Sequence, residues 1–423
     1  MQDLKREERI MGIKANKKTI PVAVAAASML ALSACSGGTD VQSPGTESGG
    51  AGAASLRVVD YYFNEPDQQF YQEILDKCSG EVGVTLEREV IPGDELVSKI
   101  LQMSSSRTLP DILMVDSPDL PQIAASGALT PIDELGLTAE GEAQGIIDAA
   151  TYEGKVYGLQ PVANSIGLFY NVDMLEEAGV KPPTTWEELR EASKTLTEGS
   201  RYGLAITAKA DYEGAWTFLP FMWSNGINED DLKQPGMVEA LQYWKELFTN
   251  ESISESALNW TQADTNEQFM EGNAAMMING PWQIPLLNEK EGLNWGVVEI
   301  PVPKAGDTSI APLGGELWAV PRSEDSDKQA LAAEVIQCIN EDQNQLDLAV
   351  KRQTVPSKPA LHADFAEQAP DMQIFSGIVQ NARSRTAILG EEWPKTGVEI
   401  YTAFQSVLVG DKTPEQAVEA ITQ

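Results

Sequence analysis

Histidine, cysteine and basic residues are scarce in this chain. Its 423 residues include one histidine, three cysteines and 30 lysines and arginines, against 64 aspartates and glutamates, so that the formal net charge is −34. Nucleic-acid-binding proteins need basic patches that contact phosphates, and we therefore expect no nucleic-acid partner. With His362 as the only histidine, histidine-based catalysis and histidine-rich metal sites are not expected either.

Signature motifs of common catalytic sites are also missing. The sequence contains no GxSxG, HExxH, GxxxxGK(S/T) or GxGxxG pattern, which argues against serine hydrolases, zinc proteases, P-loop NTPases and dinucleotide-dependent enzymes. We therefore predict a protein that is not an enzyme and that needs no cofactor and no metal. Because carboxylates are abundant, a secreted glycoside hydrolase with two catalytic carboxylates stays as an alternative.

The cysteines show no paired motif, since no CxxC sequence is present. Cys78 continues an apolar helical stripe with Phe70 and Ile74, and Cys338 continues another with Leu331 and Val335. Free cysteine is commonly a small buried apolar side chain. We therefore expect two core thiols at these positions and no disulfide.

The amino terminus has an apolar run that is too short to span a membrane. Counted from Met11, three lysines precede apolar residues 20–32, and the segment Leu-Ser-Ala-Cys at 32–35 puts small residues before a cysteine. This order resembles the lipobox of bacterial lipoproteins, which implies that Cys35 carries the lipid. We expect residues 1–34 to be a signal peptide that starts at Met1 or Met11, and residues 35–55, rich in glycine and serine, to be a flexible tether.

Strands and helices alternate along the rest of the chain. Residues 55–62, 82–90 and 110–116 have strand patterns, and helical patterns over 67–78 and 94–105 separate them, which is typical of a mostly parallel sheet. Thr185 and Glu188 form a capping box at the start of a later helix. The chain is too long for one hydrophobic core, so we expect two lobes.

The most informative stretch is FMEGNAAMMINGPW at 269–282. Its residues 274–278 predict a short buried strand, which the following Asn-Gly-Pro ends. Trp282 then lies at the carboxyl end of that strand, the edge where open α/β sheets bind ligands. An indole there offers a flat apolar face and one N–H, which suits a sugar ring. A core position for Trp282 is the alternative.

Sugar sites combine stacking aromatic rings with planar polar groups that bind hydroxyls in pairs. Asn64, Glu65, Asp116 and Asn164 lie at predicted strand ends and are candidates for the polar part. For each aromatic residue taken singly, core packing and ligand contact are both compatible with the sequence. The aromatic residues beside predicted turns are Tyr61, Tyr62, Trp216, Trp223, Trp282, Trp318 and Trp393.

Five stretches together resemble the extracellular solute-binding proteins of ABC importers, the group that includes the maltose-type binding proteins. They lie at 109–132, 157–189, 269–282, 312–321 (PLGGELWAVP) and 409–421 (VGDKTPEQAVEAI). The resemblance implies an α/β fold, namely the two-lobed clamshell of type II periplasmic binding proteins, with a mostly parallel sheet flanked by helices in each lobe. It places lobe 1 at 56–163 and 315–355, lobe 2 at 166–311 and 360–423, and hinges near 162–165, 312–315 and 354–359.

The resemblance also implies a ligand site between the lobes. Trp282 matches the family's stacking tryptophan, Asp116 matches the polar residue that ends the third strand, and Asn164 lies at the first crossover. That strand ends in MVDSPDL, without the aromatic residue of the maltose-type proteins, which argues against maltose itself. The implied substrate-binding residues are Asn64, Glu65, Asp116, Asn164, Trp216, Trp282, Gly315, Glu316, Arg385 and Trp393.

The function implied by this resemblance is that of a lipid-anchored protein on the extracellular face of the cell membrane. It would capture a carbohydrate, with an oligosaccharide favoured, and deliver it as a monomer to the transmembrane subunits of an ABC permease. One alternative is a binding protein of the same fold for a peptide, a polyamine or an ion. An adhesive surface lipoprotein without a ligand is another.

Overall fold

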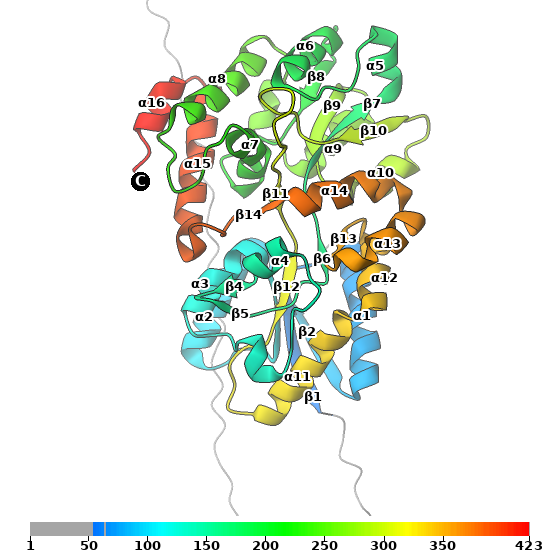
Figure 1. Ribbon diagram of the computed structural model, residues 1–423, viewed down its shortest axis with the longest axis vertical. Helices are drawn as coiled ribbons and strands as arrows, with labels where there is room; N and C mark the ends of the chain where they lie inside the picture. Colours follow the sequence, from blue (N-terminus) through cyan, green and yellow to red (C-terminus); the bar gives the residue numbers. More distant parts are fainter. Residues whose placement is uncertain (1–53, 63–64, 423) are drawn as a thin grey trace, which may run out of the picture. The chain divides into compact units, whose positions relative to one another are not determined.

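A computed structural model describes residues 54–62 and 65–422, which belong to one compact unit (Figure 1). Cys35, the signal peptide, almost all of the tether and Asn64 lie outside the described residues, and what the sequence says of them stays a prediction. In the described part of the chain, no helix is long and apolar enough to cross a membrane.

The first sheet has the strand order β12-β3-β1-β2. Its strands are β1 (Ser55–Asp60), β2 (Thr85–Val90), β3 (Ile112–Asp116) and β12 (Glu316–Ala319). β1 pairs in parallel with β2 and β3, whereas β12, which arrives from much later in the chain, pairs antiparallel with β3. The expectation of a mostly parallel sheet is therefore confirmed here.

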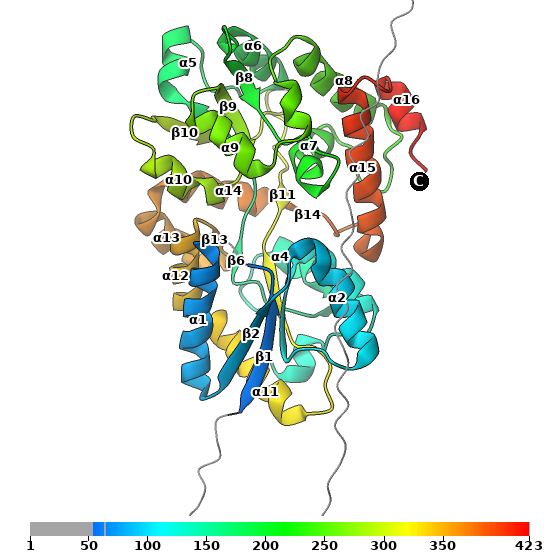
Figure 2. The same ribbon diagram turned by 180° about the vertical axis from the view of Figure 1, so that it is seen from behind.

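Side chains along β3 alternate between two cores, as the period of a strand requires. Ile112 and Met114 pack in the core that contains α1 (Asp67–Val82) and α11 (Ser326–Ile339). Leu113 and Val115 pack in the core that contains α2 (Gly93–Ser106) and α3 (Leu120–Ala125). Helices therefore cover both faces of this sheet, as the two opposite views show (Figures 1 and 2).

The second sheet has the order β10-β7-β9-β8, with β7 (Gly167–Asn171), β8 (Tyr202–Ala205), β9 (Ala274–Asn279) and β10 (Trp295–Val298). β8 runs parallel to β9, but β7 runs antiparallel to both β9 and β10. The prediction of a mostly parallel sheet is wrong for this lobe. β7 starts at the crossover from the first sheet, where Gly167 pairs with Asn279 at the end of β9, and must therefore run against β9.

Helices cover the second sheet on both faces as well. Leu168 and Met276 pack with α6 (Trp186–Leu196), α7 (Tyr212–Ser224), α8 (Pro235–Thr249) and α15 (Trp393–Leu408). Phe169 and Met277 pack with α9 (Gln262–Met270), α10 (Ile284–Glu289) and α14 (Gln373–Asn381). The other helices are α4 (Gln144–Ala149), α5 (Val172–Ala178), α12 (Asp342–Arg352), α13 (His362–Gln368) and α16 (Pro414–Glu419).

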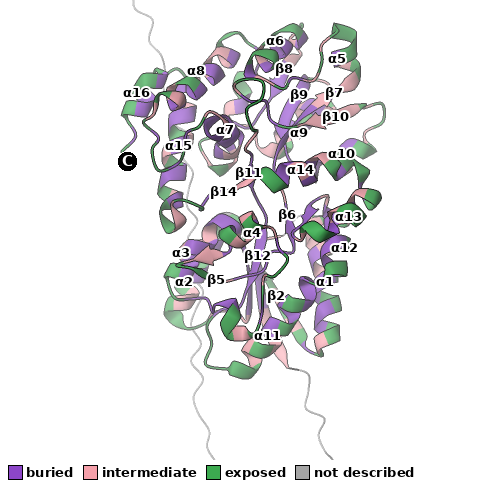
Figure 3. Cartoon of the chain, in the orientation of Figure 1, coloured by how far each residue is buried: buried purple, intermediate pink, exposed green. Residues whose placement is uncertain are grey.

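Two of the local predictions are confirmed directly. Thr185 and Glu188 form the capping box that opens α6. All six residues of β9 are buried, and the strand ends at Asn279 as predicted. Figure 3 shows buried inner strands and exposed residues on the outer sides of helices, whereas the edge strands β2 and β10 contain no buried residue.

The chain crosses between the two sheets along three neighbouring segments (Figure 1). β6 (Val162–Ala163) pairs with β13 (Val355–Pro356), and β11 (Pro312–Leu313) pairs with β14 (Arg383–Ser384). β4 (Thr151–Tyr152) and β5 (Lys155–Val156) form a separate short pair. Gly315, between β11 and β12, has a φ of 135°, and a Cβ there would lie 2.2 Å from Gln160 Nε2, so this crossing needs a glycine.

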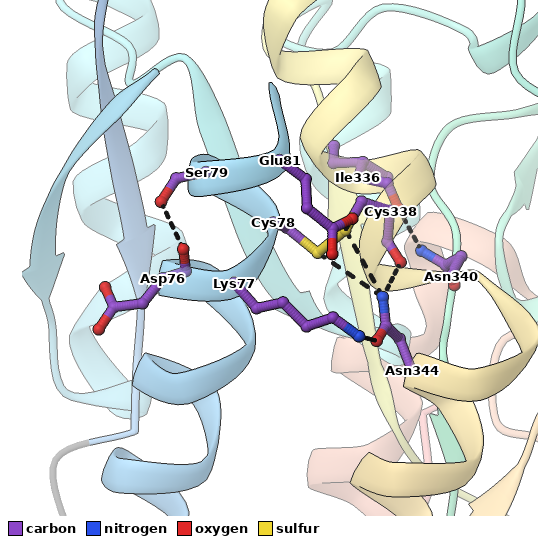
Figure 4. The surroundings of a disulfide bond; sticks show 9 residues. All are labelled: Asp76, Lys77, Cys78, Ser79, Glu81, Ile336, Cys338, Asn340 and Asn344. Carbon is purple, nitrogen blue, oxygen red and sulfur yellow. Dashed lines mark hydrogen bonds between the residues drawn. A yellow bond between two sulfur atoms is a disulfide. The ribbon is translucent and has the colours of Figure 1, made fainter. Parts of the chain in front are cut away.

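Cys78 and Cys338 form a disulfide, so the prediction of two free thiols is wrong (Figure 4). Both side chains are buried, as their helical stripes indicate, at 0% and 5% exposure. The two stripes belong to α1 and α11, helices that pack against each other in the first lobe although the cysteines are 260 residues apart. Spacing within a helix shows which face is buried but carries no information about the helix that covers it.

Candidate functional site

A cavity of about 690 Å³ lies between the two sheets. On the side of the first sheet, its wall includes residues after β1, at the end of β3 and at the start of α3. On the side of the second sheet, the wall is formed by the start of α7, the residue after β14 and the start of α15. The residues that matter for its chemistry are Tyr61, Asp116, Asp119, Lys209, Asp211, Tyr212, Glu213, Arg385 and Trp393.

Arg385 and Asp116 both line this cavity, and they form an ion pair between the end of β3 and the segment after β14. Asp116 is the last residue of β3, and Arg385 follows β14, which pairing with β11 holds in place. Arg385 Nη2 lies 3.2 Å from Asp116 Oδ2, and the arginine side chain is 4% exposed. Burial raises the pKa of the Asp116 carboxyl, the Arg385 charge opposes that rise, and the nearby Glu316 charge adds to it.

Two tryptophans of the second lobe form a chain of ring contacts that starts at the Arg385 side chain of this ion pair. The guanidinium carbon of Arg385 lies 4.8 Å from the centre of the Trp216 ring, on α7. Trp216 in turn meets Trp282 edge to face, with 6.2 Å between ring centres. Both indoles are half-buried, whereas Trp244 is fully buried. The structure thus brings Asp116, Arg385, Trp216 and Trp282 into one continuous cluster that borders the cavity through its two charged members.

Asn164 lies at the crossover beside this cluster. Its backbone exchanges two hydrogen bonds with Gly314, of 3.0 and 2.9 Å. A Cβ on Gly314 would lie 2.1 Å from Asn164 Oδ1 and 2.5 Å from Trp216 Cη2, so the three residues are in close contact. Asn164 Oδ1 is buried and accepts no hydrogen bond from the residues that the structure describes. Within the described part of the chain it is therefore a free acceptor beside the Trp216 indole.

Glu316 does not line the cavity, unlike the predicted residues Asp116 and Arg385. Its buried carboxylate accepts hydrogen bonds from the hydroxyls of Tyr61, Tyr62 and Tyr71 and from Arg352. Burial alone would raise the pKa of Glu316, but the Arg352 charge and these hydrogen bonds outweigh it and lower the pKa. All of these partners of the Glu316 carboxylate belong to the first lobe, and Glu316 does not line the cavity. Tyr61 donates to Glu316 and also lines the cavity.

Three further predicted residues have individual positions. Gly315 lies at the crossing glycine pair, and its carbonyl accepts the Ser117 N–H at 3.1 Å. Trp393 touches the cavity but is 2% exposed and belongs to the core of the second lobe. Glu65 is exposed at the start of α1, where its carboxylate accepts the Gln69 N–H, and it does not line the cavity.

Sequence reasoning missed several residues of the cavity wall. Asp211 caps α7 by accepting the N–H groups of Glu213 and Gly214, and it pairs with Lys209 at 2.8 Å. An N-cap pattern before an aromatic helix was the available signal. Asp119 lies within the DSPDL segment, but nothing local shows that it lines the same cavity as Glu213, which comes from the other lobe.

Asp119 has an unusual electrostatic environment. Burial raises its pKa to about 7, the neighbouring Asp116 charge adds to the rise, and Arg385 opposes it. Its carboxyl makes no side-chain hydrogen bond to the residues that the structure describes, and α3 begins without a side-chain cap from it. Asp119 is thus a titratable group in the cavity wall that feels the Arg385 charge but makes no salt bridge within the described part of the chain.

Known proteins resemble this chain in sequence and in fold. A protein of Brucella abortus (strain 2308), named as a binding protein, is 25% identical over 384 residues, which is 87% of this chain and 92% of that protein. The maltodextrin-binding protein MdxE of Bacillus subtilis (strain 168) is 24% identical and covers 89% of this chain and 90% of its own length. The GacH receptor of Streptomyces glaucescens, solved unliganded and with acarbose, superimposes with a TM-score of 0.76 at 23% identity, over 87% of this chain and 96% of the receptor.

The structural likeness confirms the two-lobed α/β fold of the maltose-type periplasmic binding proteins. Residues 73–373, well over half of the chain, match the family described as bacterial extracellular solute-binding protein. This range contains the whole second sheet, every strand of the first sheet except β1, and most of the cavity wall. The chain belongs to the bacterial extracellular solute-binding proteins.

Proposed function

We propose that this protein is the lipid-anchored, substrate-binding component of an ABC importer for a carbohydrate, with an oligosaccharide favoured. The sugar binds between lobe 1 (56–163 and 315–355) and lobe 2 (166–311 and 360–423). The loaded protein, a monomer, delivers the sugar to the transmembrane subunits of the permease. It performs no chemistry on the sugar.

The single observation that carries this proposal is the cluster of Asp116, Arg385, Trp216 and Trp282 beside the cavity between the sheets. Half-buried indoles offer faces on which sugar rings stack, and the charged pair offers planar groups that bind hydroxyls in pairs. The names of relatives support the same class, because MdxE binds maltodextrin and the GacH receptor was solved with acarbose.

Contacts to both lobes explain how binding would be signalled. A ligand that touches both sheets favours the conformation in which the lobes are closest, by its difference in affinity for the open and closed forms. The three crossings at 162–165, 312–315 and 354–359 are the places where such a rotation would occur. The permease then recognises the closed form.

We expect Trp282→Ala to weaken sugar binding at least tenfold while the fold is kept, because the variant removes a stacking face. Calorimetric titration with the sugar that binds the native protein measures this. Trp295→Ala is the matched control, since Trp295 is also half-buried but packs on Phe169, outside the cluster of Asp116, Arg385, Trp216 and Trp282. Equal affinity of the Trp282 variant and the native protein would remove Trp282 from the site.

We expect Cys35→Ala to abolish lipid attachment, because the lipid would be attached through the thiol of this cysteine. Cells that express the variant should release the protein, whereas the native protein should fractionate with membranes and incorporate labelled palmitate. Ser36→Ala, one residue along, is the control and should behave as the native protein does. Membrane retention and labelling of the Cys35 variant would contradict the anchor.

A second candidate within the family is a cationic solute. The cavity wall contains four carboxylates, those of Asp116, Asp119, Asp211 and Glu213, and two basic side chains, those of Lys209 and Arg385. This balance disfavours anions and leaves a polyamine as the non-sugar alternative. A glycoside hydrolase would release shorter sugars on prolonged incubation, and we expect none.

A further inference from the structure

The buried carboxylate of Glu316 connects the core of the first lobe to the cavity wall. It accepts hydrogen bonds from four donors, namely the hydroxyls of Tyr61, Tyr62 and Tyr71 and the guanidinium of Arg352. Of these four residues, Tyr61 alone lines the cavity. The hydrogen bond from the Tyr61 hydroxyl to Glu316 Oε1, 3.1 Å long, therefore reaches from the core to a ring in the cavity wall.

Both ends of this hydrogen bond are in the protonation state that it needs. Burial raises the pKa of the Glu316 carboxyl, but the Arg352 charge and the hydrogen bonds outweigh burial and lower the pKa overall, so the carboxyl is ionised. Burial also raises the pKa of the Tyr61 hydroxyl, and the Glu316 charge adds to that rise, so the hydroxyl stays protonated. A hydroxyl that donates to a carboxylate makes one of the stronger hydrogen bonds. The Tyr62 ring, centred 4.8 Å from the Tyr61 ring, packs against it as well.

Glu316 is itself held in place through the backbone. It directly follows the crossing glycine Gly315, whose carbonyl accepts the Ser117 N–H at 3.1 Å. It also pairs with Asp116 across strands β12 and β3, and Asp116 belongs to the ion pair that lines the cavity. The Glu316 carboxylate therefore fixes the Tyr61 ring relative to one crossing between the sheets and relative to Asp116.

We propose that Glu316 is a positioning residue for the ligand, which holds the Tyr61 ring in the cavity wall as a preformed stacking face for a sugar. This inference rests on the proposed sugar-binding function and adds to it a residue that acts without touching the ligand. Sequence reasoning placed Glu316 among the substrate-binding residues, and in the structure its effect on the ligand runs through Tyr61. A ring that is already ordered spares the ligand the loss of side-chain freedom, which changes affinity by a factor of up to about ten.

The test is calorimetric titration of the purified protein with maltotriose, cellotriose and raffinose, and the sugar that binds the native protein most tightly is used for the variants. Tyr61→Phe removes the hydroxyl that Glu316 holds and leaves the ring and every contact of Arg352 in place, so this variant is expected to fold. Tyr243→Phe is the matched control, because Tyr243 also donates to a buried acceptor, the Trp186 carbonyl at 3.0 Å, but does not line the cavity.

Two further variants test the carboxylate. Glu316→Gln removes its charge at constant shape, and the double variant Tyr61→Phe, Glu316→Gln shows whether the two residues act together. The thermal midpoint of every variant is recorded, so that a loss of affinity can be compared with a loss of stability. Spermidine is titrated separately.

We expect Tyr61→Phe to bind the sugar about fivefold more weakly than the native protein, and Tyr243→Phe to bind it with native affinity. The double variant should bind no more weakly than Glu316→Gln, because the two residues act through one hydrogen bond. A purely structural role of Glu316 would instead make affinity follow the thermal midpoint in all of the variants, Tyr243→Phe included.

Native affinity in Tyr61→Phe would overturn this inference and leave the sugar-binding function intact. Losses that multiply in the double variant, or affinities that follow the midpoints, would do the same. Binding of spermidine with no binding of any of the three sugars would overturn both.

Discussion

Replacing Arg352 with methionine is expected to lower the free energy of unfolding by about 3–5 kcal/mol, because it leaves the buried Glu316 carboxylate without its counter-charge. Arg352 ends α12, and its side chain is 5% exposed. Its guanidinium lies 3.1 Å from Glu316 Oε2 and 2.8 Å from Asp67 Oδ1, and it donates to the hydroxyls of Tyr62 and Tyr71. Urea unfolding followed by circular dichroism measures the change.

Arg57→Met is the matched control for this experiment. Arg57 pairs with Glu89 at 3.2 Å, but the two side chains are 41% and 51% exposed. Exposed pairs contribute less than about 1 kcal/mol, so this variant should unfold close to the native midpoint. If both variants lost equally little stability, the buried network around Glu316 would not have the structural role assigned to it.

Removing the disulfide is the second change with a large expected effect. The double variant Cys78→Ser, Cys338→Ser should lose about 2–4 kcal/mol, because the bond closes a loop of 260 residues and restricts the unfolded chain. The bond also links α1, near the start of lobe 1, to α11, which belongs to the second segment of that lobe. The residues of lobe 2 at 166–311 lie between these two helices in the sequence. Thermal unfolding with and without a reductant measures the loss.

The reductant supplies the internal control. The native protein should lose stability on reduction, and the double variant should be insensitive to it. Native protein that showed two free thiols by mass spectrometry after alkylation, with the same midpoint as the variant, would contradict the disulfide.

Features set by local sequence could be predicted. The period of β9, the Asn-Gly-Pro that follows it and the capping box of α6 depend on residues within a few positions of each other, and the structure has them where the sequence puts them. The relation of Trp282 to the end of β9 follows for the same reason. The fold class also followed, since the resemblance rests on several such local stretches in a fixed order.

Features set by contacts between distant segments could not be predicted. The direction of β7 depends on where the chain crosses from the first sheet, and the pairing of Cys78 with Cys338 depends on how α1 packs on α11. The local sequence around Glu316 matches a ligand-binding stretch of the family. In the structure, however, Arg352 from the distant helix α12 binds the Glu316 carboxylate, and the local sequence does not show this contact. Asp119 and Glu213 become neighbours of one cavity only through the arrangement of the two lobes.

The most direct test of the account is thermal unfolding of the purified protein against a panel of neutral and aminated mono- and oligosaccharides, with polyamines and short peptides as comparison. A ligand that binds only the native state at a hundredfold excess over Kd adds about 2.7 kcal/mol of stability, which raises the midpoint by several degrees. The account predicts such a rise with one class of saccharide. A midpoint that no saccharide moves, while a polyamine or a peptide raises it, would contradict the assignment of a sugar to this site.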